Sequence, residues 1–431
     1  MSKRNWVVVA SVFTSACFGF AALTGAVLAT GCEKKKPDGS SSGMAGAGDK
    51  GPAMPGITAT EIKIGQTMPY SGPASAYGAI GTTEKAYFQM INDKGGINGR
   101  KITLMSLDDS YQPPKTVEQT RKLVENEGVA FVFGSVGTAC NTAVQKYLNE
   151  KKVPQLFVAT GADKWADPEH FPWTIGWQPS YRTEARIYAR YLLKEKPAAK
   201  VCVLYQNDDL GKDYIAGLKD IFGDQYDKMV LEKASYEATD PTVDSQVMTL
   251  QAKGCDTLIT AAIPKFGAQV IRKVFDTGWK PLHIMSNVAV SITAGLKPAG
   301  LDKSVGIITG GYLKDPNDPN MANDPGIKDY RAFMKQYEAS LPGIDPGDTN
   351  ALYAYGVSMT LVNVLTKCGN DLSRENIMKQ AASLSKFVVP VAIQGTELTT
   401  SATDFRVFSQ LQLSRFNGTN FEPFGDVLSA D

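Results

Sequence analysis

The amino-acid sequence predicts an α/β protein made of two doubly wound lobes, each built on a parallel sheet. Two observations predict this class. Short apolar runs alternate with amphipathic helical stretches along most of the chain, as they do in sheets whose strands are joined by helices. About 375 residues follow the first 56, more than one hydrophobic core usually serves, so two lobes are expected.

The first unit of this alternation spans Glu61 to Leu104. Ile62 and Ile64 alternate with polar neighbours, which predicts a strand, and two prolines and a glycine within 68–73 predict that a loop follows it. Apolar residues then recur at steps of three and four, so Gly81 to Asn92 is predicted to be an amphipathic helix.

Glycines end this helix and predict a tight hairpin. Lys94-Gly95-Gly96 is a helix stop, and Asn98-Gly99 lies between two expected short strands, the second of which includes Ile102. Further strands are expected at Val129–Phe133, Gln155–Val158, Lys200–Tyr205, Thr257–Ala262 and Leu282–Met285, and helices at Thr116–Asn126, Thr138–Glu150, Arg182–Lys194, Asp213–Phe222, Val243–Lys253 and Ala268–Thr277.

Residues 1–31 are predicted to be an export signal. Lys3 and Arg4 supply positive charge, and residues 6–30 contain no charged side chain. The segment ends in Leu28-Ala29-Thr30-Gly31-Cys32, which resembles the bacterial lipobox and makes Cys32 the expected lipidation site. Because the leucine lies one place earlier than usual and the apolar run is long enough to span a bilayer, an uncleaved membrane anchor is the alternative.

Residues 32–56 are predicted to be a disordered tether between the membrane and the folded body. The segment is rich in Lys, Ser, Gly and Ala and has almost no large apolar side chain, so it cannot bury enough surface to fold. The whole chain has a formal net charge of +1 at pH 7. Such a balance argues against a nucleic-acid partner, which needs a strongly positive surface.

Three segments in order carry a resemblance to a known family: Gly65–Pro73, Tyr77-Gly78, and Asn92 through Arg100. They are similar to the first loop and first hairpin of the branched-chain amino-acid-binding proteins, which are type I periplasmic binding proteins that feed ABC importers. The resemblance extends from about Thr58 to Leu428. It implies a membrane permease as partner, a monomer, and no cofactor.

The resemblance also implies a hinge in which the chain crosses three times between the lobes. The crossings are expected near Gly176–Pro179, Thr309–Leu313 and Pro390–Thr403. One lobe would then comprise 57–178 with 311–395, and the other 179–310 with 396–431. A terminal hairpin is expected over 410–427, with its turn at Asn417-Gly418.

Ligands of open parallel sheets bind beyond the carboxyl ends of the strands. The turn that ends in Gly137-Thr138 opens a predicted helix, where free N–H groups and the threonine hydroxyl suit a carboxylate, although a plain helix cap has the same pattern. The resemblance implies that this turn holds the ligand carboxylate. It further implies that Ala159 and Thr160 supply a carbonyl and a hydroxyl, and that Tyr77 forms an aromatic wall.

In the other lobe the resemblance places Leu210, Ile263 and Val288 in the cleft. Amino-acid-binding members have a carboxylate at about the place of Val288, where it receives the ligand's ammonium group, and valine cannot do so. We therefore expect a ligand with an acid group and a hydrophobic or aromatic body but no α-amine. A hydrophobic amino acid is the alternative, with its ammonium on Asp240, Asp244 or Asp256 if the alignment is shifted.

The sequence contains no motif of an enzyme. It lacks a Gly-x-Ser-x-Gly elbow and a phosphate-binding loop, and its only two histidines, His170 and His283, are isolated. Neither a metal nor a catalytic triad is expected, and an exported hydrolase is a minor alternative. A ligand-sensing receptor of the same fold, coupled to a signalling partner, is the other alternative.

Cysteines and aromatic residues leave two further questions open. Cys202 and Cys255 each open a predicted strand of one sheet, so a disulfide is conceivable, but buried free thiols are the expectation. An aromatic cluster precedes the first crossing, and packing is favoured over a place at the cleft mouth. Its members are Trp165, Phe171, Trp173, Trp177 and Tyr181.

Overall fold

The computed structural model describes residues 54–429. The predicted export signal, Cys32 and the tether as far as residue 53 lie outside the described residues. Within 54–429, no helix is long and apolar enough to cross a membrane.

The first of two sheets contains five parallel strands in the order β2-β1-β3-β4-β5. β1 and β2 pair in register from Glu61 with Lys101 to Met68 with Asp108. The strands are β1 Glu61–Met68, β2 Lys101–Asp108, β3 Val132–Phe133, β4 Gln155–Val158 and β5 Thr174–Gly176.

The second sheet contains seven strands in the order β12-β11-β10-β9-β8-β6-β7. Its five parallel strands are β6 Val201–Gln206, β7 Val230–Tyr236, β8 Thr257–Ala261, β9 Leu282–Met285 and β10 Ile308–Gly311. The predicted terminal hairpin is present as β11 Gln410–Phe416 and β12 Phe421–Ser429, which pair antiparallel at the edge beside β10.

Both sheets have the same order over their parallel strands, because β2-β1-β3-β4-β5 corresponds to β7-β6-β8-β9-β10. In each sheet the chain places its second strand on one side of the first and its third strand on the other side. The boundaries β1/β3 and β6/β8 are therefore topological switch points, where loops diverge and leave a crevice at the carboxyl ends of the strands.

Helices cover the two sheets and define two lobes. The first lobe contains the first sheet with α1 Gly78–Asp93, α2 Pro113–Arg121, α3 Thr138–Glu150, α10 Pro325–Gln336, α11 Thr349–Cys368 and α12 Arg374–Ala381. The second contains the second sheet with α4 Tyr181–Glu195, α5 Asp209–Phe222, α6 Tyr226–Met229, α7 Asp244–Ala252, α8 Pro264–Asp276 and α9 Lys297–Ala299. Short 3₁₀ or π turns lie at Ser75–Tyr77, Lys122–Asn126, Asp163–Ala166, Gly223–Gln225, Asn287–Ala289, Ile292–Leu296, Asp302–Ser304, Pro319–Asn323 and Glu338–Ser340.

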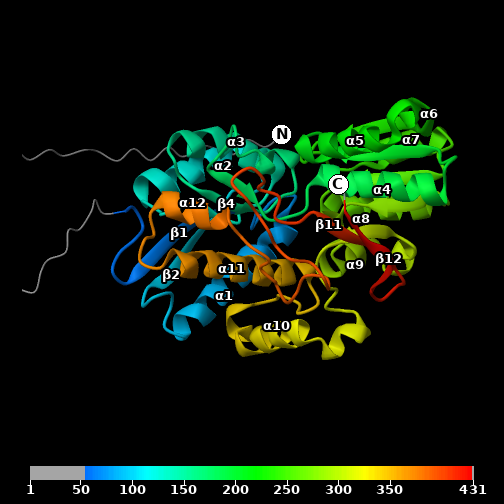
Figure 1. The fold of residues 1–431 in the computed structure, drawn as a ribbon. Helices are drawn as coiled ribbons and strands as arrows, with labels where there is room; N and C mark the ends of the chain where they lie inside the picture. The colour runs from blue at the N-terminus through cyan, green and yellow to red at the C-terminus, as the bar shows by residue number, and fades with distance from the viewer. Residues whose placement is uncertain (1–53, 430–431) are drawn as a thin grey trace, which may run out of the picture. The chain divides into compact units, whose positions relative to one another are not determined.

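The chain passes three times between the lobes: after β5, after β10 and after α12. After β10 the chain returns to the first lobe. Figure 1 shows the result: the orange helices α11 and α12 lie beside the blue and cyan elements of that lobe. Aromatic rings join them, with Tyr355 of α11 packed 5.1 Å from Tyr87 of α1. Segments more than 250 positions apart thus share one core.

Several predicted elements have different bounds in the structure. The helix expected at Asp213 begins at Asp209, because the Asp208 side chain accepts from the Leu210 N–H (3.0 Å) and caps the helix. The helix expected at Ala268 begins at Pro264, where proline suits the first helical position. The expected strand at Ile97 is a single bridge to Arg100 around the Asn-Gly turn.

The expectation of free thiols at Cys202 and Cys255 is wrong, because the two residues form a disulfide. Cys255 lies just before β8, which pairs with β6 in a register that sets Val201 opposite Thr257. This pairing brings the two Cα atoms to 5.8 Å, within disulfide range. Cys140 and Cys368 of the first lobe are free and buried.

Candidate ligand-binding site

A cavity of about 770 Å³ lies between the lobes, at the carboxyl ends of both parallel sheets and at both switch points. All eight residues that were predicted to bind the ligand line it. They are Tyr77, Gly137, Thr138, Ala159 and Thr160 from the first lobe, and Leu210, Ile263 and Val288 from the second. The structure thus brings them together, and their role in binding stays a prediction.

The first-lobe wall of the cavity carries a cluster of hydroxyl groups. The Oγ1 atoms of Thr138 and Thr160 are 2.5 Å apart and hydrogen-bonded, and the hydroxyl of Tyr181, the first residue of α4 in the second lobe, lies 3.3 Å from Thr160 Oγ1. Thr138 is the first residue of α3, whose first N–H groups have no partner within the helix. Hydroxyls and free N–H groups at a helix N-terminus together suit a carboxylate.

The turn before α3 has a backbone that only glycine adopts readily. Gly137 has a φ of 104°, and a Cβ atom at this position would meet the Tyr111 ring at 2.7 Å. The Asn141 side chain stabilises the turn, because its Nδ2 donates to the carbonyls of Ser135 (2.9 Å) and Gly137 (2.8 Å). The hydroxyl cluster is therefore held in place by buried hydrogen bonds.

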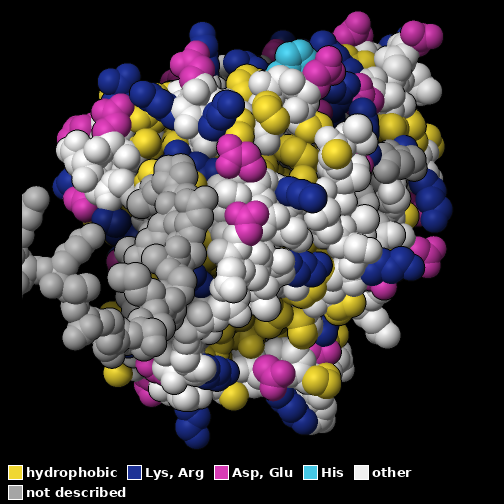
Figure 2. All heavy atoms as spheres, turned by 60° about the vertical axis from the view of Figure 1, so that its left-hand side comes forward, with side chains coloured by type: hydrophobic (Ala, Val, Ile, Leu, Met, Phe, Trp, Pro, Cys, Tyr) yellow, Lys and Arg dark blue, Asp and Glu magenta, His cyan; other side chains and the backbone are white. Residues whose placement is uncertain are grey.

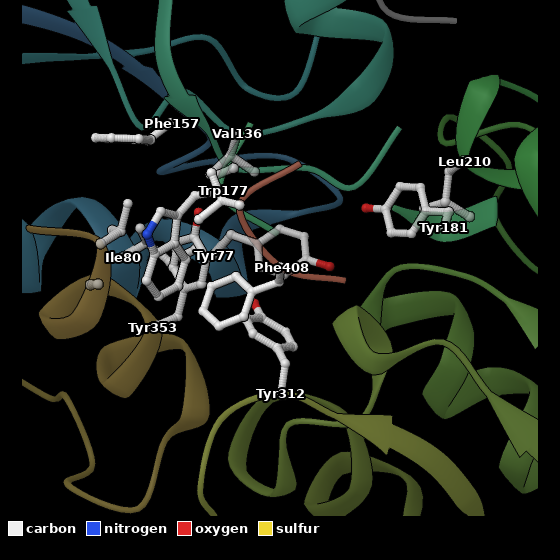
Figure 3. Packing of buried hydrophobic residues seen from close by; sticks show 14 of the residues in the cluster. Tyr77, Ile80, Val136, Phe157, Trp177, Tyr181, Leu210, Tyr312, Tyr353 and Phe408 are labelled. Atoms are coloured by element: carbon white, nitrogen blue, oxygen red, sulfur yellow. The ribbon is translucent and has the colours of Figure 1, made fainter. Parts of the chain in front are cut away.

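The three predicted residues of the second lobe give its wall an apolar part, beside polar lining residues such as Tyr181 and Asn287. Leu210 follows β6, Ile263 follows β8 and Val288 follows β9, so each side chain comes from the carboxyl end of a strand of the second sheet. Figure 3 shows Leu210 and Tyr181 on one side of the site and Tyr77, Ile80 and Val136 on the other. These three side chains offer van der Waals contact and supply no charge.

None of the three carboxylates that might replace a lost ammonium site lines the cavity. Asp256 lies 2.9 Å from the Lys196 amine, Asp244 lies 3.6 Å from that of Lys273, and Asp240 accepts from the Glu237 N–H. The acidic side chains among the described residues that do line the cavity follow β10 or precede β11. They are Asp315, Asp318, Asp324 and Glu397.

These acidic residues lie apart from the hydroxyl cluster in sequence, and three of them have partners. Asp324 pairs with Lys314 (2.7 Å), Asp315 accepts from the Phe421 N–H (2.9 Å), and Asp318 caps the following turn. Their oxygens are thus already used to hold the segments between the lobes.

Besides the Thr160–Tyr181 contact, two hydrogen bonds between residues that line or adjoin the cavity join the lobes. The Tyr77 hydroxyl donates to the Val288 carbonyl (2.9 Å), and Gln206 Nε2 donates to the Tyr111 hydroxyl (3.4 Å). Both tyrosines are buried, which raises the pKa of each well above its usual value, so they stay neutral. The two bonds connect the lobes beside the cavity.

A buried glutamate positions the loop of Val288. Glu184 of α4 accepts from the Asn287 backbone N–H and from its Nδ2, both at 2.8 Å, and also from the Tyr188 hydroxyl. Burial raises the pKa of Glu184 to about 7. Sequence reasoning missed this residue, because a glutamate near the start of an amphipathic helix normally faces water.

Other lining residues were also missed. Tyr111 lies in the loop after β2 with a φ of 60°, Tyr312 follows β10, Tyr353 belongs to α11, and Gln178 follows β5. Tyr111, Tyr312 and Gln178 follow strand ends and could have been found by the same rule as the predicted residues, whereas Tyr353 lies inside a helix that no strand end marks. Of the aromatic cluster, Trp177 packs in the core against Tyr353 and Phe408, so packing is correct for this residue, while Tyr181 lines the cavity.

No group of His, Cys, Asp or Glu side chains that could hold a metal ion occurs in the part of the chain that the structure describes. The visible face in Figure 2 carries positive and negative side chains interspersed. The site is thus a largely apolar interlobe cavity with one hydroxyl-rich wall.

Two α/β lobes that enclose a cavity at their switch points define a ligand-binding protein. The family model described as "Periplasmic binding protein" matches residues 61–420, and the chain belongs to this family. Its members are binding proteins rather than enzymes, and membership implies a location outside the cytoplasm.

The chain is similar to several curated relatives. The Leu/Ile/Val-binding protein homolog 3 of Brucella melitensis is 28% identical over 233 residues, which span 52% of this chain and 60% of that protein. The Leu/Ile/Val-binding protein homolog 7 of Brucella suis is 23% identical over 325 residues, spanning 71% of this chain and 77% of that one.

Solved structures share the fold. The structure of a branched chain amino acid ABC transporter from Thermus thermophilus with bound valine has a TM-score of 0.76 at 14% identity, and the match covers 86% of this chain and 97% of that one. A fatty acid ABC transporter substrate-binding protein from Thermomonospora curvata has a TM-score of 0.71 at 20% identity, covering 87% and 94%.

Proposed function

We propose that this protein captures a small acid with a hydrophobic or aromatic body and no α-amine, and delivers it to the permease of an ABC importer. The observation that carries the proposal is the contrast between the cavity walls. Hydroxyls and the N-terminus of α3 on the first-lobe wall suit a carboxylate, whereas the second-lobe wall has apolar side chains, including Val288 where an ammonium would need a carboxylate.

Capture proceeds by closure of the lobes. The acid group binds first to the hydroxyl cluster, and the second lobe then covers the apolar body and excludes water. The Tyr77–Val288 and Gln206–Tyr111 hydrogen bonds join residues of different lobes, so they would hold the lobes together after closure. The hinge lies in the three crossings, with lobe boundaries at 57–178 plus 311–395 and 179–310 plus 396–431.

The names of related proteins support a hydrophobic acid in general terms. Relatives are described as binding Leu, Ile and Val, one solved structure holds valine, and another is a fatty acid transporter component. These ligands share an acid group and an apolar body and differ in the α-amine. A hydrophobic amino acid is therefore the second candidate ligand for this chain.

In this proposal the chain is cleaved before Cys32. Cys32 is then lipidated and anchors the body in the membrane near its permease. The segment that follows Cys32 then acts as a tether. Metabolic labelling with a palmitate analogue tests this point: we expect labelling of the full chain and none of a Cys32→Ala variant. Equal labelling of both would contradict the lipid anchor.

A thermal-shift panel tests the ligand class. The body from Gly56 would be unfolded and refolded to remove carried ligand, then mixed with leucine, valine, phenylalanine, benzoate and 3-phenylpropanoate. A ligand at a hundred times its dissociation constant adds about 2.7 kcal/mol, which moves Tm by several degrees. We expect shifts with the amine-free acids alone. Shifts with the amino acids alone would refute the proposed ligand class.

A further inference from the structure

The side-chain amide of Asn287 belongs to the second-lobe wall and is bonded on its inner side. Asn287 follows β9, lines the cavity and is partly exposed. Its backbone N–H donates to Glu184 Oε1 and its Nδ2 donates to Glu184 Oε2, both at 2.8 Å. Glu184 is fully buried in α4, so this pair of bonds lies behind the wall.

These two bonds fix the direction in which the amide points. A carboxylate only accepts hydrogen bonds, so the amide nitrogen faces Glu184 and the amide oxygen, Asn287 Oδ1, is turned away from it. Oδ1 has no hydrogen-bond partner among the described residues, and it is not one of their buried unpaired polar atoms. It is therefore accessible, and the space that Asn287 borders is the interlobe cavity.

Neighbouring polar groups of this loop are already engaged. The Val288 carbonyl accepts from the Tyr77 hydroxyl (2.9 Å), and Ser286 Oγ donates to the Ala262 carbonyl (2.9 Å). Asn287 Oδ1, by contrast, remains available to a ligand. When the lobes close and exclude water, a ligand without a donor at this place leaves an acceptor unpaired, which is unfavourable.

The acceptor lies near the acid end of the cavity. Glu184 is three residues beyond Tyr181 in α4, a rise of about 4.5 Å, and the Tyr181 hydroxyl lies 3.3 Å from Thr160 Oγ1. Less than one helical turn therefore separates the residue that orients Asn287 from the residue that reaches the hydroxyl cluster. A ligand group that bonds to Asn287 Oδ1 belongs on a carbon close to the acid.

We propose that the ligand carries a hydroxyl on the carbon next to its acid group, and that Asn287, oriented by Glu184, accepts its hydrogen bond. The ligand class is then a hydrophobic 2-hydroxy acid. A hydroxyl donates without a charge, so it needs no carboxylate at Val288, whereas an oxo group on the same carbon would set two acceptor oxygens against each other. Glu184 is a positioning residue, since it contacts Asn287 and not the ligand. The inference rests on the proposed function, in that the acid lies on the hydroxyl cluster.

Four acids that differ only at the carbon next to the acid test this inference: 3-phenylpropanoate, 2-hydroxy-3-phenylpropanoate, 2-oxo-3-phenylpropanoate and phenylalanine. Titration calorimetry would use the refolded body at pH 8, above the Glu184 pKa of about 7, so that this carboxyl is ionised. We expect the hydroxy acid to bind about tenfold tighter than the unsubstituted acid. The oxo acid should bind more weakly than both.

Glu184→Gln should turn the amide round. The Asn287 backbone N–H needs an acceptor, so the new side chain places its oxygen there and its nitrogen opposite the Asn287 amide, which then presents Nδ2 to the cavity. The oxo acid should now bind tighter than the unsubstituted acid, whereas damage to the fold would weaken all four acids together. Glu84→Gln is the matched control, because Glu84 is also fully buried but does not line the cavity, and the original order should remain.

Asn287→Ala removes the acceptor and keeps the backbone N–H that bonds to Glu184. The hydroxy acid and the unsubstituted acid should then bind equally. Melting curves verify that each variant folds, and Asn287→Ala carries the test by itself if Glu184→Gln does not fold.

Each outcome has one meaning. Equal affinity of the hydroxy acid and the unsubstituted acid for the unaltered protein would overturn this inference and leave the proposed function in place. A hydroxyl preference that persists in Asn287→Ala, or an order unchanged in a folded Glu184→Gln variant, would also overturn it. Tightest binding of phenylalanine, lost in Asn287→Ala, would overturn the amine-free ligand and support Asn287 as the acceptor. Failure of all four acids to bind would overturn both proposals.

Discussion

The two lobes share one strand order but present opposite chemistry to the cavity and are stabilised differently. The first lobe offers hydroxyls and a helix N-terminus, and its cysteines are free. The second offers Leu210, Ile263 and Val288, and a disulfide joins its β6 to the start of β8. Under the proposed function, this difference divides the work: directional bonds would set the ligand's position on one lobe, and burial by the other would supply affinity.

Removal of the disulfide should have the largest effect on stability. The crosslink closes a loop of 53 residues, and its loss in a Cys202→Ala, Cys255→Ala variant should lower the free energy of unfolding by about 4 kcal/mol. Chemical denaturation with intrinsic fluorescence measures this loss. The control removes both free cysteines of the first lobe, Cys140 and Cys368, and a loss of the same size there would show that the effect comes from packing alone.

Removal of both hydroxyls from the first-lobe wall should have the largest effect on binding. A Thr138→Val, Thr160→Val variant keeps the side-chain shape and should weaken the best acid of the panel by about a hundredfold, since each lost bond to a charged group costs more than tenfold. Calorimetry measures the change. Thr120→Val, a buried threonine that does not line the cavity, is the control. Unchanged affinity in the double variant would place the acid elsewhere.

Stability should fall as the pH rises from about 4.5 to about 7. Burial raises the pKa of Glu184 from 4.5 to about 7, so the folded state binds more protons than the unfolded state within this window. Between pH 5.5 and pH 8 the loss from this group is about 2 kcal/mol. Asp208 and Asp213, also in the second lobe, act in the same direction because burial raises their pKa to about 6 and about 7.

Melting temperatures across this range measure the effect, and Glu184→Gln should flatten the curve. Asp220 acts outside this window, because its partner Arg182 lowers its pKa to about 2. Stability that rises between pH 5.5 and pH 8 would contradict the neutral form of Glu184.

A negative charge on the second-lobe wall should shift the ligand preference from amine-free acids toward amino acids. Val288→Asp supplies the carboxylate that an ammonium needs, so hydrophobic amino acids should gain about tenfold relative to their amine-free analogues. Val288→Asn, with the same shape and no charge, is the control. If both variants keep the original preference, the α-amine would not lie near this position.

The smallest effect is expected from the bond that joins the walls. Tyr77→Phe removes the hydroxyl that donates to the Val288 carbonyl (2.9 Å) and should weaken the best ligand about fivefold, through faster dissociation from a less stable closed state. Stopped-flow kinetics separates the two rates. A slower association with unchanged dissociation would mean that Tyr77 acts in the first encounter instead.

The amino-acid sequence alone determined the fold class and much of the site. Apolar periodicity is a local property, and the carboxyl ends of parallel strands meet at one edge, so the turn at Thr138 was a candidate ligand site from the sequence pattern. The family resemblance added Leu210, Ile263 and Val288. All eight predicted residues line the cavity. The segments Gly65–Pro73 and Asn92–Arg100 carried the resemblance to the family.

Only the tertiary structure decided the rest. The Cys202–Cys255 bond depends on the register of β6 and β8, and since β7 and α7 lie between these strands in the sequence, no hairpin turn fixes that register. Tyr353 reaches the cavity from a helix that returns to the first lobe. These contacts form because segments distant in the sequence pack together. Hydrophobic periodicity shows only which face of its own helix or strand a residue occupies, so it does not predict them.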